Sequence, residues 1–112
     1  MVLEAGDIAK AAGVAYESML HAALALEKQK LGFASDEPDK VVAVFRNEFF
    51  DTELFFDPFS GGKFAQYFFQ AHERRGVRHT TETARQLIEE AQLFIEASHS
   101  CYARMAAAPV LV

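Results

Sequence analysis

Apolar residues along this chain recur at the spacing of α-helices. In the last third of the sequence they return every three or four positions, beginning at Ala84 and Leu87 and ending at Met105. This spacing places them on one helix face, and Thr80 or Thr81 stands before the run as the N-cap. No segment alternates apolar and polar residues with period two, and the sequence contains no Asn-Gly or Asp-Gly turn. The pattern predicts an all-α protein.

The N-terminal segment predicts a second long helix, from about Asp7 to Leu31, with Gly32 as its C-cap. This segment carries two apolar stripes, which indicates burial on two sides. Either the helix is central or one of its faces meets another subunit. The first stripe comprises Ile8, Ala12, Ala15, Met19, Ala22 and Leu26, and the second comprises Tyr16, Leu20, Leu24 and Leu31.

Two shorter helices are expected between the long ones. One begins after Ser35, with acidic residues and Pro38 in its first turn. Residues 51–58 bend or restart this helix and then end it, and another helix follows Gly62. With short connections, these elements predict an antiparallel four-helix bundle forming a single domain over residues 1–112, or five helices if residues 52–56 form a short one.

Composition narrows the class of protein. A chain of 112 residues with 51% hydrophobic and 24% charged residues is long and apolar enough for one folded domain. Its net charge of −5 disfavours binding to nucleic acid over the whole surface, so we expect no DNA partner. The single cysteine excludes an internal disulfide framework and a cysteine-rich zinc site.

The expected setting and assembly also follow from composition. No apolar run approaches the length of a membrane-spanning helix, and no basic leader begins the chain, so we expect a cytoplasmic protein without a membrane partner. The eleven phenylalanines gather mainly between Phe33 and Phe69. This is much aromatic bulk for one small bundle, which favours a homodimer formed through a helix face.

A basic cluster interrupts the acidic chain. Arg74, Arg75, Arg78 and His79 lie within six residues, just before the predicted last helix. Arginine binds phosphate through paired N–H groups, and the N-terminus of a helix attracts anions. The cluster therefore predicts a site for a nucleotide or another anionic ligand. The alternative is a solvated turn, in which the cations merely complement the C-terminal end of the preceding helix.

The segment from Arg74 to His79, with four residues between them, resembles the R-x4-6-H motif of the HEPN family. Residues 21–30, an apolar run leading into Glu-Lys, resemble the end of a HEPN first helix, and residues 81–105 resemble the closing helix. The resemblance implies a small antiparallel bundle that usually dimerises. In active members, arginine and histidine from two subunits cleave RNA without metal. Arg74 would then stabilise the phosphate, and His79 would assist proton transfer.

Three departures from that pattern favour a non-catalytic member. Arg75 follows the motif arginine where a small polar residue is usual, Gly76 indicates a loop inside the motif, and the chain is acidic overall. We therefore expect a binding or interaction module with a nucleotide, RNA or protein partner. A metal-independent ribonuclease using Arg74 and His79 is the alternative.

Ser60, Gly61, Gly62 and Lys63 form a second candidate anion site, because glycine amides and a lysine at a helix start cradle anions. The alternative is a flexible turn, and the spacing is not that of a P-loop. The wider string Phe49–Lys63 resembles segments of small helical modules associated with sirohaem nitrite or sulfite reductases. That resemblance implies an accessory role beside a larger enzyme.

The sequence gives little support for a metal site or for a reactive cysteine. Glu96 and His99 have the Glu-x-x-His spacing of di-iron bundles, and Glu17 and His21 lie one helical turn apart, but a di-iron site needs two such motifs and two further glutamates. We expect no metal and no cofactor. Cys101 lies near the apolar stripe of the last helix, as expected of a small buried hydrophobe.

Overall fold

The computed structural model describes residues 5–107, and they form helices joined by turns and loops. The elements are α1 (Ala5–Leu31), α2 (Pro38–Phe45), α3 (Lys63–Glu73) and α4 (Thr81–Ala107), with a π-helical turn, η1 (Arg46–Phe50), continuing α2. Over these residues there is no β-strand, only an isolated bridge between Asp57 and Gly61. The predicted all-α class and the four helices are confirmed. No helix within residues 5–107 is long and apolar enough to cross a membrane.

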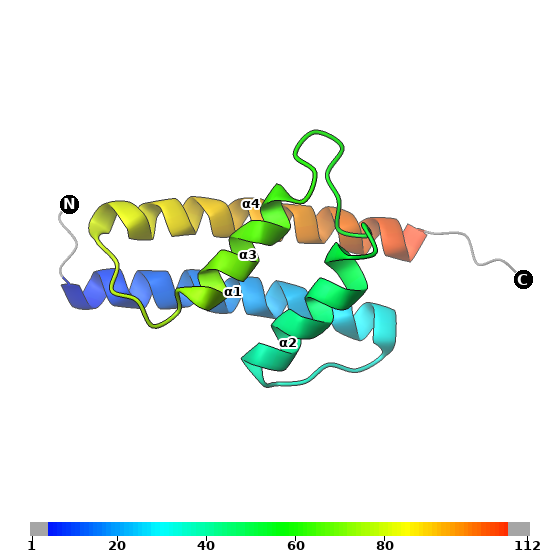
Figure 1. Ribbon diagram of the computed structural model, residues 1–112, viewed down its shortest axis with the longest axis horizontal. Helices are drawn as coiled ribbons and strands as arrows, with labels where there is room; N and C mark the ends of the chain where they lie inside the picture. The colour runs from blue at the N-terminus through cyan, green and yellow to red at the C-terminus, as the bar shows by residue number, and fades with distance from the viewer. Residues whose placement is uncertain (1–4, 108–112) are drawn as a thin grey trace, which may run out of the picture.

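The two long helices, α1 and α4, lie side by side along the long axis of the molecule (Figure 1). They run in the same direction, because α2, the loop and α3 return the chain to the end at which α1 begins. In agreement, Gln29 near the end of α1 donates a hydrogen bond to the backbone of Tyr102 near the end of α4. The antiparallel arrangement expected from sequence therefore describes α3 and α4 but not the pair of long helices.

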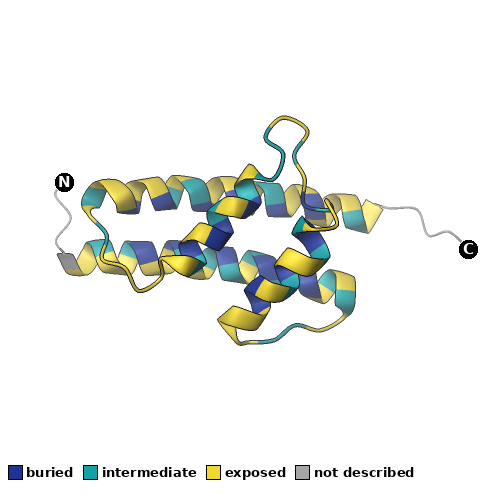
Figure 2. Cartoon of the chain, in the orientation of Figure 1, coloured by how far each residue is buried: buried dark blue, intermediate teal, exposed yellow. Residues whose placement is uncertain are grey.

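A cluster of phenylalanines forms the centre of the core. Phe45 is fully buried, and each helix that crosses this region turns its buried face inward (Figure 2). One copy of the chain buries six of its eleven phenylalanines, so aromatic bulk by itself does not require a second copy. The ring of Phe45 lies 5.1–6.0 Å, between centroids, from those of Phe49, Phe55, Phe68, Phe69 and Phe94.

Both apolar stripes of α1 are covered within one copy. Residues of the first stripe such as Met19 and Leu26 are fully buried, while Leu20 and Leu24 of the second are half-buried against the core. The helix ends as predicted at Gly32, which has a left-handed φ of 82° and donates from its backbone N–H to the carbonyl of Lys28. α1 is thus a central element of the fold.

The short helix expected near residues 52–56 is absent, and the extra element is η1. The amide of Asp51 donates to the carbonyl of Arg46, five residues back, at 2.8 Å. The chain then leaves helical geometry at Glu53, whose φ is 60°, and the amide of Phe55 donates to the carbonyl of Phe49. This wider turn places both Phe49 and Phe55 in the core, which a continuous regular helix through residue 56 would not do.

Candidate functional site

A groove of about 540 Å³ runs between the N-terminal half of α1 and the loop from α3 to α4. α3 ends with Arg74 as its C-cap, and the loop then passes α1 before Thr80 caps the start of α4. The groove is lined by Ile8, Ala9, Ala12, Gly13, Tyr16, Ala71, Arg75, Gly76, Val77, Arg78, His79 and Leu87.

All charged or titratable side chains on the wall of this groove, Tyr16 apart, are basic. They are Arg75, Arg78 and His79, and no carboxylate belongs to the lining. Arg78 is exposed and forms no ion pair with any residue that the structure describes. Apolar side chains such as Ile8 form the rest of the wall. The arrangement suits an anion that also carries an apolar part.

A chain of hydrogen bonds connects the groove to α2. The Tyr16 hydroxyl lies 2.6 Å from Nδ1 of His72, and Nε2 of His72 lies 2.8 Å from Oδ1 of Asp39. Arg75 completes the set, since its Nη1 donates to the backbone carbonyl of His72 at 2.6 Å and its Nη2 lies 3.3 Å from Asp39. We call this set the Tyr16–His72–Asp39 chain. It joins α1, α2 and α3 and holds Arg75 against them.

Tyr16 acts in this chain as a neutral phenol. Burial raises its pKa, the charge of Asp39 raises it further, and the charge of Arg75 lowers it. Nδ1 of His72 lies at the Tyr16 hydroxyl and Nε2 at Asp39, so both ring nitrogens are engaged within the chain. As a neutral phenol, Tyr16 offers a ligand hydrogen bonds but no activated nucleophile.

The predicted basic cluster is divided by the fold. Arg75, Arg78 and His79 line the groove, but Arg74 does not. Arg74 lies instead on a depression of only about 40 Å³ on the other side of the loop, which His79 also borders. There it faces Glu90, whose pKa is raised by burial in spite of the charges of Arg74 and Lys63.

The N-terminus of α4 is closed by a pair of threonines. Thr80, one of the two predicted N-caps, accepts from the amide of Thr83 at 3.1 Å, and Oγ1 of Thr83 accepts from the amide of Thr80 at 2.8 Å. The same Oγ1 lies 3.2 Å from Nδ1 of His79. This cap orients the histidine and satisfies the amide of residue 83, which is then not free for an anion.

The segment from Ser60 to Lys63 lies at the opposite end of α3 from the basic cluster, about 16 Å away along an eleven-residue helix. The structure accounts for a glycine at both positions of this segment. Gly61 has a left-handed φ of 62°, and a Cβ on Gly62 would lie 2.7 Å from Cε2 of Phe50. The two predicted anion sites are therefore separate, and the one at residues 60–63 stays a prediction.

Metal ligands do not gather among residues 5–107, where no group of three or more histidine, cysteine or acidic side chains is found. Glu96 and His99 are exposed on α4, and Glu17 and His21 on α1. Cys101 is buried, with Sγ 3.7 Å from the carbonyl of Leu54, and burial raises the pKa of its thiol. It behaves as the small hydrophobe that the sequence predicted.

Sequence reasoning missed Tyr16, Asp39 and His72. The apolar pattern places Tyr16 in a stripe, and the helix dipole accounts for acidic residues at the start of α2. Each lies on a different helix, so no spacing along the chain relates them. Comparisons with protein-family models, with curated proteins and with solved structures find no match for this chain. The HEPN resemblance therefore stays a prediction.

Proposed function

We propose that this chain is a non-catalytic binding module that holds a nucleotide or a similar anion with an apolar part in the groove between α1 and the α3–α4 loop. The observation that carries the proposal is the sign of the charges there. Three basic side chains and no carboxylate line the groove, in a chain whose net charge is −5.

The volume and wall of the groove support this ligand class. Its volume of about 540 Å³ lies within the range of roughly 300–1,000 Å³ that small-molecule sites occupy. Arg78 offers a guanidinium without an intramolecular partner among residues 5–107, so it is free to bind phosphate through two N–H groups. Ile8, Ala12 and Leu87 provide apolar contacts for a base or another ring.

Arg75 contributes a preorganised charge. Its contacts with Asp39 and with the carbonyl of His72 hold the guanidinium at the groove before any ligand arrives. A side chain already held in place loses less conformational freedom on binding. The nearby carboxylate of Asp39 reduces its net attraction for an anion, so Arg78 is expected to supply the larger share of the affinity.

The test is titration calorimetry with adenosine monophosphate and with inorganic phosphate. Arg78→Ala is expected to weaken binding of the nucleotide by about tenfold or more, the loss of one charged hydrogen-bonding partner. The matched control is Arg74→Ala, which removes a neighbouring arginine outside the groove and should change the affinity by less than about twofold. Equal affinity of the Arg78→Ala variant and the parent, or no binding by the parent at millimolar nucleotide, overturns the proposal.

The ribonuclease alternative would use a different depression, the one beside Arg74. Arg74 and His79 both border the cavity of about 40 Å³, which is too small to enclose a nucleotide. An assay with labelled RNA in the presence of a chelator separates the two functions. Cleavage that is lost in both Arg74→Ala and His79→Ala would favour the enzyme, whereas nucleotide binding without cleavage supports the binding module.

A further inference from the structure

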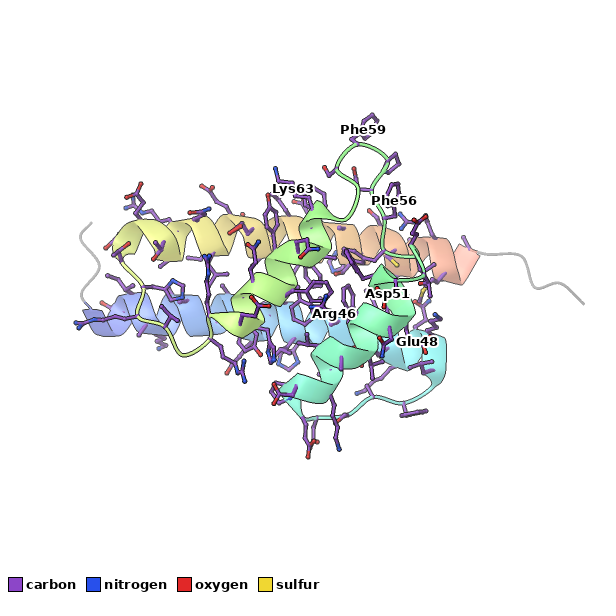
Figure 3. The ribbon with its side chains drawn as sticks, in the orientation of Figure 1. Arg46, Glu48, Asp51, Phe56, Phe59 and Lys63 are labelled. Atoms are coloured by element: carbon purple, nitrogen blue, oxygen red, sulfur yellow. The ribbon has the colours of Figure 1, made fainter. Side chains whose placement is uncertain are left out.

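A second surface, away from the groove, combines an exposed aromatic ring with a cavity. The loop of residues 57–61 projects from the bundle with Phe59 at its tip (Figure 3). The side chain of Phe59 is 97% exposed. We call this loop with its ring the knob. Burying this ring against a partner would remove a large apolar area from water, and aromatic residues are enriched among interface anchors.

The knob is held in one conformation by its own hydrogen bonds. Oδ1 of Asp57 accepts from the amides of Phe59 and Ser60, both at 2.8 Å. The backbones of Asp57 and Gly61 exchange two further bonds, of 3.1 and 2.7 Å. Because the loop is ordered in advance, placing Phe59 against a partner requires little further loss of conformational freedom.

A cavity of about 210 Å³ opens at the base of the knob. This volume is below the roughly 300 Å³ at which small-molecule sites begin, so one inserted side chain is the occupant that fits. The wall combines aromatic and aliphatic side chains with four charged or polar ones. It consists of Phe55, Phe56, Asp57, Gly61, Phe64, Leu93, Glu96, Ala97, Ser100 and Arg104.

Two oppositely charged side chains of α4 lie beside this cavity, and they can pair between two copies of the helix. Glu96 and Arg104 are exposed, carry opposite charges and stand four residues to either side of Ser100. Neither forms an ion pair with any residue between 5 and 107. If two copies of α4 cross antiparallel with a two-fold axis at Ser100, Glu96 of each copy meets Arg104 of the other.

We propose that this face pairs with the same face of a second copy of the chain, forming a symmetric dimer in which Phe59 of each copy occupies the cavity of the other. Knob and cavity are neighbours on one face, as a two-fold interface requires, since each patch must contact its counterpart on the other copy. The paired Glu96 and Arg104 side chains offset the repulsion between two chains of net charge −5. None of these residues lines the groove of the proposed function, so the two proposals stand or fall separately.

The experiment is sedimentation equilibrium of the full chain over a series of micromolar concentrations. The parent is expected to approach twice its mass of 12.5 kDa. Phe59→Ala is expected to raise the dimer dissociation constant by about tenfold or more, as loss of a central anchor does. The control is Phe33→Ala, which removes another ring that is 73% exposed but distant in sequence from the knob, and it should leave the constant unchanged.

A charge exchange tests the arrangement of α4. Glu96→Arg and Arg104→Glu should each weaken the dimer, and the double variant should restore it, because the exchanged pairs again meet as opposites. A monomeric parent, a dimer unaffected by Phe59→Ala, or a double variant no stronger than the single ones overturns the proposal. A parent that stays monomeric but binds a reductase-type enzyme through Phe59 also overturns it and favours the accessory role instead.

Two measurements keep these outcomes apart from misfolding and from the nucleotide proposal. Circular dichroism should show unchanged helicity in every variant, because the altered side chains are exposed or at the cavity edge. Nucleotide affinity should persist in Phe59→Ala, and dimerisation should persist in Arg78→Ala.

Discussion

Glu27 makes the stability of this protein depend on pH in a direction opposite to that of most acidic residues. It lies on the buried face of α1 between Ala23 and Leu31, and none of its side chain is exposed. Neither carboxylate oxygen has a hydrogen-bond partner among the described residues. Burial alone raises the pKa of this carboxyl from 4.5 to about 7, because the charged form loses its hydration without gaining a partner.

The sign and size of the effect follow from the raised pKa. The folded protein binds the proton of Glu27 more tightly than the unfolded chain does, so this stabilisation is fully present below about pH 4.5 and is lost as the pH rises through about 7. Each pKa unit corresponds to about 1.4 kcal/mol, which sets an upper limit of about 3 kcal/mol. That is a large share of the roughly 5–15 kcal/mol by which proteins are stable.

Glu27→Gln keeps the shape of the side chain and removes its charge. Urea unfolding at several pH values between about 5 and 8 gives the free energy of unfolding. As the pH rises over this range, the free energy of unfolding should fall by up to about 3 kcal/mol more in the parent than in the variant. Glu17→Gln, an exposed position on the same helix, is the control and should follow the parent. An equal loss of stability in Glu27→Gln and the parent would show that Glu27 is not the source of this pH dependence.

Three further substitutions and one control test the packing of the fold. Phe45→Ala should lower the free energy of unfolding by about 3–5 kcal/mol, since it empties the centre of the aromatic core, and urea unfolding measures it. Tyr16→Phe should cost about 1 kcal/mol by leaving Nδ1 of His72 without its hydrogen-bond partner, seen as a lower thermal midpoint. Gly62→Ala should cost about 1–3 kcal/mol because its Cβ would meet the ring of Phe50, whereas Gly76→Ala, with open space around it, should cost less than 1 kcal/mol. Equal midpoints for the two glycine variants would contradict the proposed contact.

Local features of this protein were predictable from the sequence because they depend on residues a few positions apart. The three-to-four spacing of α4, the cap at Thr80 and the glycine end of α1 at Gly32 are all set within one or two helical turns. The apolar stripes likewise indicated which face of each helix would be buried. The basic cluster at residues 74–79 was visible in the same way, as a departure from an acidic background.

Other features could not be predicted from the sequence, because they depend on how the middle of the chain returns. α1 and α4 run parallel because residues 32–80 bring the chain back to its starting end. That return places the α3–α4 loop beside α1, creates the groove and separates Arg74 from Arg78. The same return brings Tyr16 within hydrogen-bond distance of His72 and buries Glu27 in the core. No period in the sequence relates residues that meet through tertiary packing, so their contacts are determined by the shapes and volumes of the assembled helices.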